Sequence, residues 1–181
     1  MVQVTAIYNG KREQGLRMLV LFDLDGTLIS SYMDNPDRNY DHWTILPHRK
    51  EILHALLAQG HTIGIVTNQA GVAFGHITEK KAMQRIHAVF DALELTPYPA
   101  VQVSYGHPKA RIPRYRKREA VARRKPSGRM LREHIAMNPE AASEGVIYVG
   151  DRPEDEAAAK DASVDFVWTD AFFRLVSVEN K

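Results

Sequence analysis

The chain has 181 residues, of which 44% are hydrophobic and 25% charged, with a formal net charge of +2 and no cysteine. This length suits one domain with a buried core of its own. The absence of cysteine excludes disulfide frameworks, thiolate zinc sites and cysteine nucleophiles, and it fits a reducing cytoplasm. The sequence shows neither an apolar run of the roughly 18 residues that cross a membrane nor a signal-peptide pattern. We therefore expect a cytoplasmic protein without membrane association.

Short apolar runs alternate with helical patterns along the chain. Continuous apolar runs are typical of strands that are buried on both faces, whereas apolar residues three and four apart indicate helices. In chain order we expect a strand at 18–23, a helix at 47–59, a strand at 62–67, a helix at 78–93, a strand at 101–105, a helix at 129–137, a strand at 145–149, a helix at 153–162 and a short strand at 165–168. This alternation predicts an α/β fold, doubly wound around a mainly parallel sheet of about five strands. Residues 1–17 are expected to form either an edge strand or an N-terminal extension.

Polar residues follow three of the predicted strands. Asp23 and Asp25 follow the first strand, residues 67–69 follow the second, and Asp151 follows the fourth. In doubly wound sheets, ligands bind beyond the carboxyl ends of the strands, near the switch in strand order. The coincidence of three polar clusters at one sheet edge predicts a ligand site there.

The spacing of Asp23 and Asp25 suits phosphoryl transfer. One carboxylate can attack phosphorus to form an aspartyl-phosphate, and the other can protonate the leaving oxygen and then deprotonate water. Two close carboxylates repel each other, so a cation must lie nearby or one of them must hold a proton. Asp151 supplies a third acid, and such a set suits Mg²⁺. An isolated Asp-x-Asp pair is more often a turn or a solvated acid pair, so the interpretation depends on the whole set.

A site for phosphoryl transfer also needs donors for the phosphoryl oxygens. Thr67, Asn68 and Gln69 can offer a hydroxyl and backbone N–H groups, although a Thr-Asn-Gln segment alone is usually a simple turn. Lys125 can offer a positive charge. Eight other basic residues lie in the same stretch, so charge alone does not single it out.

Residues 106–125, named here the basic loop, carry most of the charge asymmetry. From Lys109 to Lys125 there are nine basic residues and one acid, Glu119, so this stretch carries +8 while the remainder of the chain carries −6. The stretch is either a solvated, partly disordered loop, a clamp over a small multiply charged metabolite, or a contact for the phosphate backbone of DNA or RNA, with Tyr115 available for stacking.

Taken in order, these segments resemble the motifs of the haloacid dehalogenase (HAD) superfamily of phosphohydrolases. The similar segments are Asp23-Leu24-Asp25-Gly26-Thr27-Leu28 for the first motif, Ile65-Val66-Thr67-Asn68-Gln69 for the second, Lys125 for the third, and Gly150-Asp151 with Asp155 for the fourth. The resemblance covers roughly Met18 to Phe173. It implies a Rossmann-like core, with residues 18–181 as the phosphatase domain.

The resemblance also implies a role for each site residue. Asp23 would be the nucleophile and a metal ligand, and Asp25 the general acid and base. The backbone carbonyl of Asp25 and the side chain of Asp151 would be the other protein ligands of a single Mg²⁺ ion. Asp155 would hold these groups in place without contacting the ion. Thr67 and Lys125 would stabilise the phosphoryl group.

A narrower similarity concerns one branch of this superfamily. Residues 67–75 and Arg124-Lys125-Pro126 are similar to the branch that holds heptose-bisphosphate, histidinol-phosphate and polynucleotide 3′-phosphatases. This similarity implies that Arg124 contacts the substrate, and we expect Asn68 and Gln69 to do so as well. Where the heptose enzyme has a cysteine-rich zinc loop, this chain keeps only His107, so we expect no zinc. The intervals 28–61 and 69–124 are too short for a folded cap domain, which predicts an open site.

The sequence thus predicts a Mg²⁺-dependent phosphatase that acts through an aspartyl-phosphate on a small phosphorylated metabolite, such as a sugar phosphate, a sugar bisphosphate or histidinol phosphate. A polynucleotide 3′-phosphatase that holds DNA or RNA through residues 109–125 is the alternative. A non-catalytic binding protein on the same fold is a further alternative. Nothing in the sequence demands more than a monomer.

Overall fold

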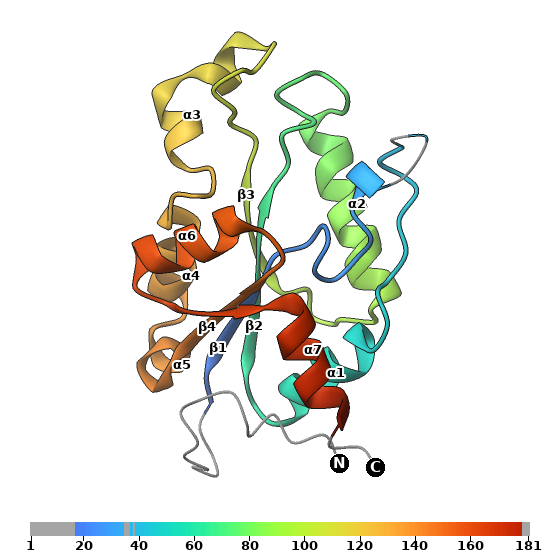
Figure 1. The fold of residues 1–181 in the computed structure, drawn as a ribbon, viewed down its shortest axis with the longest axis vertical. Coiled ribbons are helices and arrows are strands. Elements are labelled where there is room, and N and C mark those ends of the chain that lie inside the picture. Colours follow the sequence, from blue (N-terminus) through green and yellow to red (C-terminus); the bar gives the residue numbers. More distant parts are fainter. Residues whose placement is uncertain (1–16, 35–36, 38, 179–181) are drawn as a thin grey trace.

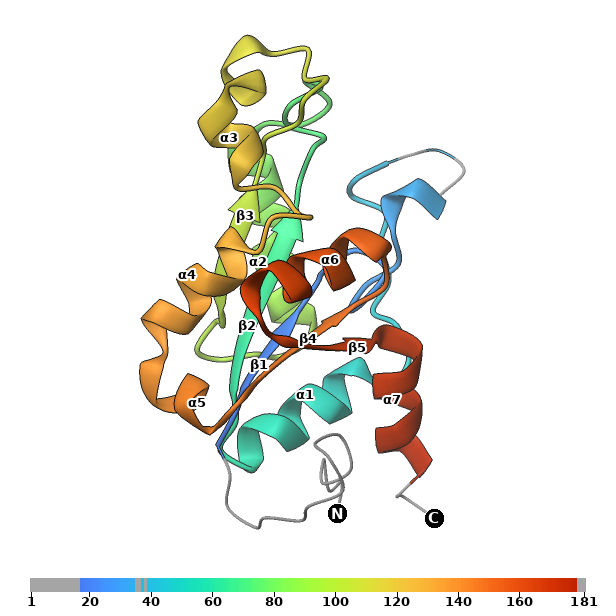
Figure 2. The ribbon, with the colours of Figure 1, turned by 60° about the vertical axis from the view of Figure 1, so that its left-hand side comes forward.

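In the computed structural model, five parallel strands form one sheet with helices on both faces (Figures 1 and 2). The structure describes residues 17–34, 37 and 39–178. The strands lie in the order β3-β2-β1-β4-β5, and their bounds are β1 Leu19–Phe22, β2 Thr62–Asn68, β3 Ala100–Ser104, β4 Val146–Gly150 and β5 Asp165–Trp168. The chain moves outward from β1 to β3 and then returns to place β4 on the other side of β1. The strand order therefore switches between β1 and β4, where doubly wound sheets bind their ligands.

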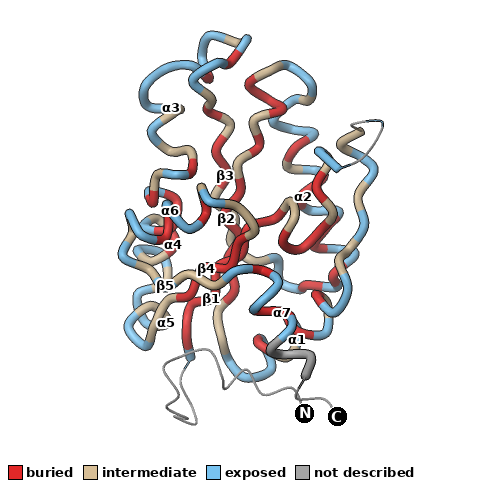
Figure 3. The backbone as a smooth tube through the Cα atoms, in the orientation of Figure 1, coloured by how far each residue is buried: buried red, intermediate tan, exposed pale blue. Residues whose placement is uncertain are grey.

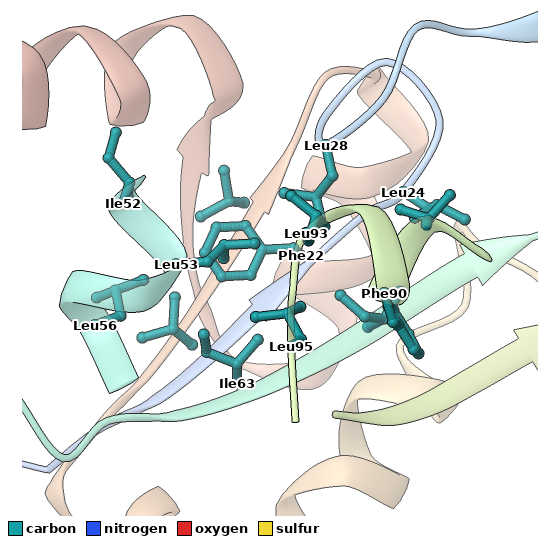
Figure 4. Close-up of a cluster of buried hydrophobic side chains, with 14 of the residues drawn as sticks. Phe22, Leu24, Leu28, Ile52, Leu53, Leu56, Ile63, Phe90, Leu93 and Leu95 are labelled. Carbon is teal, nitrogen blue, oxygen red and sulfur yellow. The ribbon is translucent and has the colours of Figure 1, made fainter. Parts of the chain in front are cut away.

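The central strand β1 is buried because it has helices against both of its faces. Val20 and Phe22 pack in the same core as α1 (Arg49–Ala58), α2 (Glu79–Ala92) and α7 (Thr169–Val178). Leu19 and Leu21 pack with α4 (Arg129–Met137) and α6 (Pro153–Ala162), beside α5 (Pro139–Glu144). Figure 3 shows the buried strands between the more exposed helices, and Figure 4 shows the core around Phe22. Complete burial of a side chain such as Phe22 contributes about 1.5–3 kcal/mol, so this core holds the sheet edge in place.

The predicted α/β architecture is confirmed, and the differences in detail have local causes. Helices α4 and α6 and strand β5 have the predicted bounds, and the other predicted elements differ by one or two residues at their ends. Helix α5 was not predicted because its six residues give too short a periodic pattern. Helix α7 was not predicted either, because it follows β5 directly and no turn signal separates the two elements. The prediction for residues 1–17 falls outside the described residues apart from Arg17.

The basic loop folds into a 3-10 helix, η2 (Pro113–Arg116), and a short helix, α3 (Arg118–Ala122). It packs on the segment that follows β2, where the N–H groups of Arg111 and Ile112 both donate to the carbonyl of Ala73 at 3.0 Å. The two sides of the loop lie close together at Gly106, since a Cβ at this position would lie 2.0 Å from the carbonyl oxygen of Ala120. Figure 1 shows the loop, in yellow, rising beyond the sheet edge next to the green segment on which it packs.

The prediction that Tyr115 is available for stacking on a base is wrong. Tyr115 is 5% exposed and belongs to a small core with Val72 and Ala110. Its hydroxyl donates to Glu79 Oε1 at 2.5 Å. The ring therefore joins the basic loop to the start of α2 and does not face solvent.

Within the described part of the chain, helices are too short or too polar to cross a membrane.

Candidate active site

Asp23 is fixed where β1 ends. Its N–H donates to the carbonyl of Val149 at 2.9 Å, which continues the ladder to β4, and its side chain is almost fully buried. The chain then turns at Gly26, whose φ of 87° lies in the left-handed region that favours glycine. A Cβ at this position would lie 2.3 Å from Asp151 Oδ2. The glycine therefore permits both the turn and the approach of Asp151.

Lys125 reaches this edge from the end of the basic loop and contacts two acids. Its Nζ lies 2.7 Å from Asp23 Oδ1 and 2.6 Å from Asp155 Oδ1, and it also donates to the Tyr148 hydroxyl at 2.9 Å. Burial disfavours the ammonium form, but the charges of Asp23 and Asp155 outweigh it and raise the pKa of Lys125. Burial, reinforced by Asp155 and Asp151 and opposed by Lys125, raises the pKa of Asp23 well above its ordinary value. Two acids therefore share one lysine at this edge of the sheet.

Three acids gather closely enough to hold a cation. Carboxylate oxygens of Asp23, Asp151 and Asp155 all lie within 4.8 Å of one another. Both oxygens of Asp155 are engaged, Oδ1 by Lys125 and Tyr148 and Oδ2 by the N–H of Arg152 at 3.1 Å. The contacts of Asp151 are longer, with Thr27 Oγ1 at 3.4 Å and Arg152 Nε at 3.7 Å, so Asp23 and Asp151 are the more available acids for a metal. Two carboxylates with oxygen donors fit Mg²⁺, which binds through one or two carboxylates.

The segment after β2 supplies the neutral polar groups. Gln69 Nε2 donates to Thr67 Oγ1 at 2.9 Å and to Asp25 Oδ2 at 2.8 Å. Asn68 uses both ends of its amide on the backbone of Lys125, since its Oδ1 accepts from the N–H at 3.1 Å and its Nδ2 donates to the carbonyl at 3.3 Å. Asn68 therefore fixes the backbone of Lys125, and its predicted contact with substrate stays a prediction.

Asp25 has a partner that sequence reasoning missed. Arg85 Nη2 lies 2.5 Å from Asp25 Oδ1, and Arg85 Nη1 donates to Asp25 Oδ2 at 3.3 Å. Arg85 lies in α2 between the buried residues Ala82 and Ile86, so it is a charged residue on an apolar helix face. That position was a usable signal, because a buried arginine nearly always has an acidic partner.

A cavity of about 140 Å³ brings most of the predicted site residues together. Arg124 Nη1 is buried there and has no hydrogen-bond partner among the described residues, which favours an anionic guest. Burial lowers the pKa of Arg124, and the nearby charge of Glu154 opposes this shift only in part. Asp151 contributes from the acid cluster and does not line the cavity. The predicted site residues that line it are Asp23, Asp25, Thr67, Asn68, Gln69, Arg124, Lys125 and Asp155.

A second cavity of about 490 Å³ adjoins the first and shares Tyr32 and Tyr40 with it. The two rings stack with their centroids 4.2 Å apart. Lys81 and Arg85 also line the second cavity. Neither tyrosine was predicted, because the segment between β1 and α1 carries no periodic pattern.

The chain matches known families and structures. Residues 18–178 match the model of the family described as polynucleotide kinase 3 phosphatase. The fold is similar to a structure described as a HAD-like phosphatase from Mesorhizobium loti, with a TM-score of 0.67 and 22% identity over 82% of this chain and 69% of that one. It is also similar to D,D-heptose 1,7-bisphosphate phosphatase from B. bronchiseptica, solved with magnesium and phosphate, with a TM-score of 0.67 and 20% identity over 90% of this chain and 99% of that one. A HAD-superfamily hydrolase from Geobacter sulfurreducens gives a TM-score of 0.58 and 14% identity over 91% and 97% of the two chains. No curated protein matches the chain.

The family match spans nearly the whole domain and includes the four segments that carry the sequence resemblance. These segments meet at one sheet edge, around an acid cluster that is compatible with Mg²⁺. The chain therefore belongs to the polynucleotide kinase 3 phosphatase family, and it is a phosphatase of the HAD superfamily.

Proposed function

We propose that this phosphatase hydrolyses phosphate monoesters through an aspartyl-phosphate formed on Asp23, with one Mg²⁺ held by Asp23, Asp151 and the backbone carbonyl of Asp25. The contact between Lys125 Nζ and Asp23 Oδ1 at 2.7 Å carries the proposal. It holds one carboxylate oxygen against a fixed positive charge and leaves the other free to attack. The same ammonium group can stabilise charge on the phosphoryl oxygens as it develops.

The reaction has two displacements at phosphorus. In the first, an Asp23 oxygen forms a bond to phosphorus, the bond to the leaving oxygen breaks, and Asp25 gives that oxygen a proton. In the second, Asp25 takes a proton from water as the water oxygen attacks phosphorus, which releases phosphate and restores Asp23. Mg²⁺, when bound, neutralises charge on the phosphoryl oxygens.

The two cavities suit the two parts of a monoester. The cavity of about 140 Å³ contains Asp23, Thr67 and Lys125 and suits the phosphoryl group. The adjoining cavity of about 490 Å³ has the size of a small-molecule site and suits the leaving group. This arrangement supports a small phosphorylated metabolite, such as a sugar phosphate, a sugar bisphosphate or histidinol phosphate, as substrate.

Phosphate release from p-nitrophenyl phosphate tests the chemistry. We expect turnover with Mg²⁺ that EDTA abolishes, and a phosphorylated Asp23 after acid quench of a rapid-mixing reaction. Asp23→Asn should lack both. Asp165→Asn is the matched control, because Asp165 is exposed at the start of β5, at the opposite end of that strand from the site. Full turnover by Asp23→Asn would refute the proposed nucleophile, and a folded protein without any turnover would favour a binding protein on this fold.

A second candidate substrate is a polynucleotide 3′-phosphate. The observation that favours it is the surface of the basic loop. Five basic residues on this surface are exposed and form no ion pair within the described chain. These residues are Lys109, Arg111, Arg116, Lys117 and Arg118. Such a surface beside an open site suits the backbone of a nucleic acid, whose binding falls steeply with added salt. The family to which the chain belongs is named for a polynucleotide phosphatase.

A substrate series separates the two candidates. It compares a 3′-phosphorylated oligonucleotide, a 3′-mononucleotide, sugar phosphates and bisphosphates, and histidinol phosphate at several salt concentrations. If the substrate is a polynucleotide, kcat/KM is highest for the oligonucleotide and falls with salt, and R116S/K117S/R118S lowers it for the oligonucleotide alone. Equal values for the mononucleotide and the oligonucleotide, with a flat salt profile, would support the small metabolite.

A further inference from the structure

The carboxylate of Asp25 is held by three donors. Two are the terminal nitrogens of Arg85, at 2.5 and 3.3 Å, and the third is Gln69 Nε2 at 2.8 Å. Paired donors from one planar guanidinium fix the plane of a carboxylate as well as its position. The side chain of Asp25 is 17% exposed and that of Arg85 is 2% exposed. The pair is therefore largely removed from solvent, with Asp25 keeping some access to the cavity.

The remaining contact of Arg85 reaches the segment between β1 and α1, which lines both cavities. Its Nε donates to the carbonyl of Tyr40 at 2.8 Å, and Tyr40 lines both cavities. Among the described residues, Asp25 is the acid that pairs with Arg85. A core position next to Ile86 needs no charge for packing, and burying a guanidinium is costly unless an acid pairs with it. The charge of Arg85 thus acts on Asp25.

We propose that Arg85 is a positioning residue that holds Asp25 in line with the leaving oxygen. The inference rests on the proposed function, because it assumes that Asp25 transfers the proton in the first displacement. Arg85 contacts the carboxylate of Asp25 and does not itself transfer the proton in this proposal. Arg85 fixes the orientation of the Asp25 carboxyl group. From this orientation Asp25 gives its proton to the leaving oxygen as the bond between that oxygen and phosphorus breaks.

Leaving groups that differ in basicity separate this role from a general structural one. An alkoxide is strongly basic and departs slowly unless it is protonated, whereas 2,4-dinitrophenolate departs without a proton. The ratio kcat/KM reports steps up to formation of the aspartyl-phosphate and is insensitive to its later hydrolysis. A misplaced Asp25 therefore lowers kcat/KM for an alkyl phosphate and spares it for 2,4-dinitrophenyl phosphate.

The experiment measures kcat/KM for β-glycerol phosphate and for 2,4-dinitrophenyl phosphate with Arg85→Met and Arg85→Lys. We expect Arg85→Met to lose roughly 100-fold on the alkyl ester, the lower end of what general acid catalysis supplies, and less than about threefold on the aryl ester. Arg85→Lys keeps the charge but not the paired geometry, so it should fall between the wild type and Arg85→Met. Melting temperatures show whether each variant is folded at the assay temperature.

Arg49→Met is the matched control. Arg49 is also a buried arginine, but its Nε donates to the carbonyl of Thr27 and its Nη1 to that of Pro47, both at 2.9 Å. Its loss should change the two kcat/KM values by the same factor. Equal losses on both esters with Arg85→Met, or no loss on the alkyl ester, would overturn the positioning role.

Asp25→Asn separates failure of this inference from failure of the proposed function. If Asp25→Asn loses activity selectively on the alkyl ester and Arg85→Met does not, Arg85 has no positioning role and the proposed proton transfer stands. If Asp25→Asn is not selective, the assignment of Asp25 as proton donor fails, and the inference fails with it.

Discussion

Lys125 is shared between Asp23 and Asp155, since its Nζ lies 2.7 Å from an oxygen of the first and 2.6 Å from an oxygen of the second. Asp155 is 1% exposed and begins the buried face of α6. The second acid that holds the lysine thus belongs to a helix whose start it also caps, because its Oδ2 accepts from the N–H of Arg152. Placement of the positive charge and formation of α6 therefore depend on the same carboxylate.

The first prediction concerns this shared acid. Asp155→Asn removes the charge that balances Lys125, so we expect a loss of about 1–3 kcal/mol in the free energy of unfolding, measured by urea denaturation. Phosphatase activity should fall as well, because Asp23 is then the one acid among the described residues that pairs with Lys125. Glu156→Gln is the control, since Glu156 is exposed in the same first turn of α6. Equal stability of the two variants would contradict the dependence of the site on Asp155.

The second prediction concerns the hydroxyl of Tyr148, which accepts from Lys125 at 2.9 Å and donates to Asp155 at 2.8 Å. Tyr148→Phe leaves the buried ring in place and removes this link, so the free energy of unfolding should fall by about 1 kcal/mol. Tyr98→Phe removes a hydroxyl that donates to Asp91 at the surface, and it should change stability by less than half as much. The urea midpoints of the two variants give the comparison.

The third prediction concerns metal binding. Asp151→Asn removes one of the two side chains left to face a cation, so the Mg²⁺ concentration for half-maximal activity should rise at least about tenfold. A titration of activity against Mg²⁺ after EDTA treatment measures this change. Asp165→Asn should leave the titration unaltered, and an unaltered titration for Asp151→Asn would remove Asp151 from the ligand set.

The fourth prediction concerns pH and the buried His134. Its Nε2 donates to the carbonyl of Ile65 at 2.8 Å, and its Nδ1 is buried without a hydrogen-bond partner among the described residues. Burial therefore lowers the pKa of His134 from 6.5. The unfolded chain binds this proton more readily, so stability is retained above about pH 6.5 and declines as the pH falls below it. Each unit of pKa lowering is worth about 1.4 kcal/mol.

Urea midpoints between pH 8 and pH 5 measure this decline. His134→Gln keeps a donor for Ile65 and removes the titration, so its midpoint should fall less over this range. Part of the decline should remain, because burial also lowers the pKa of His61. An equally steep decline in His134→Gln would show that His134 does not titrate as proposed.

The sheet and its acidic edge could be predicted because they depend on local patterns. An apolar run that ends in Asp23, and another that ends before Asp151, place both residues at strand ends, and parallel pairing then brings those ends together. No knowledge of the packing between distant segments was required.

The partners of these acids could not be predicted, because they come from such packing. Arg85 approaches Asp25 from a helix 60 residues later in the chain, and Tyr148 approaches Lys125 from a strand. Tyr115 was wrongly predicted to be available for stacking for the same reason, since its burial depends on contact with the segment after β2. A single sequence shows which residues can carry charge, whereas the balance of that charge depends on the tertiary structure.

The basic loop has two parts with different surroundings. Its two sides lie close together at Gly106, and its outer part extends beyond that point. At the C-terminal end of the loop, Asn68 forms two hydrogen bonds with the backbone of Lys125. In the outer part of the loop, basic residues such as Lys109 and Arg116 are exposed, and none of the ion pairs within the described residues joins them to the acid cluster. Substitutions among these exposed residues are therefore expected to leave the hydrogen bonds that hold Lys125 in place, so this surface can vary in sequence without disturbing the acid cluster.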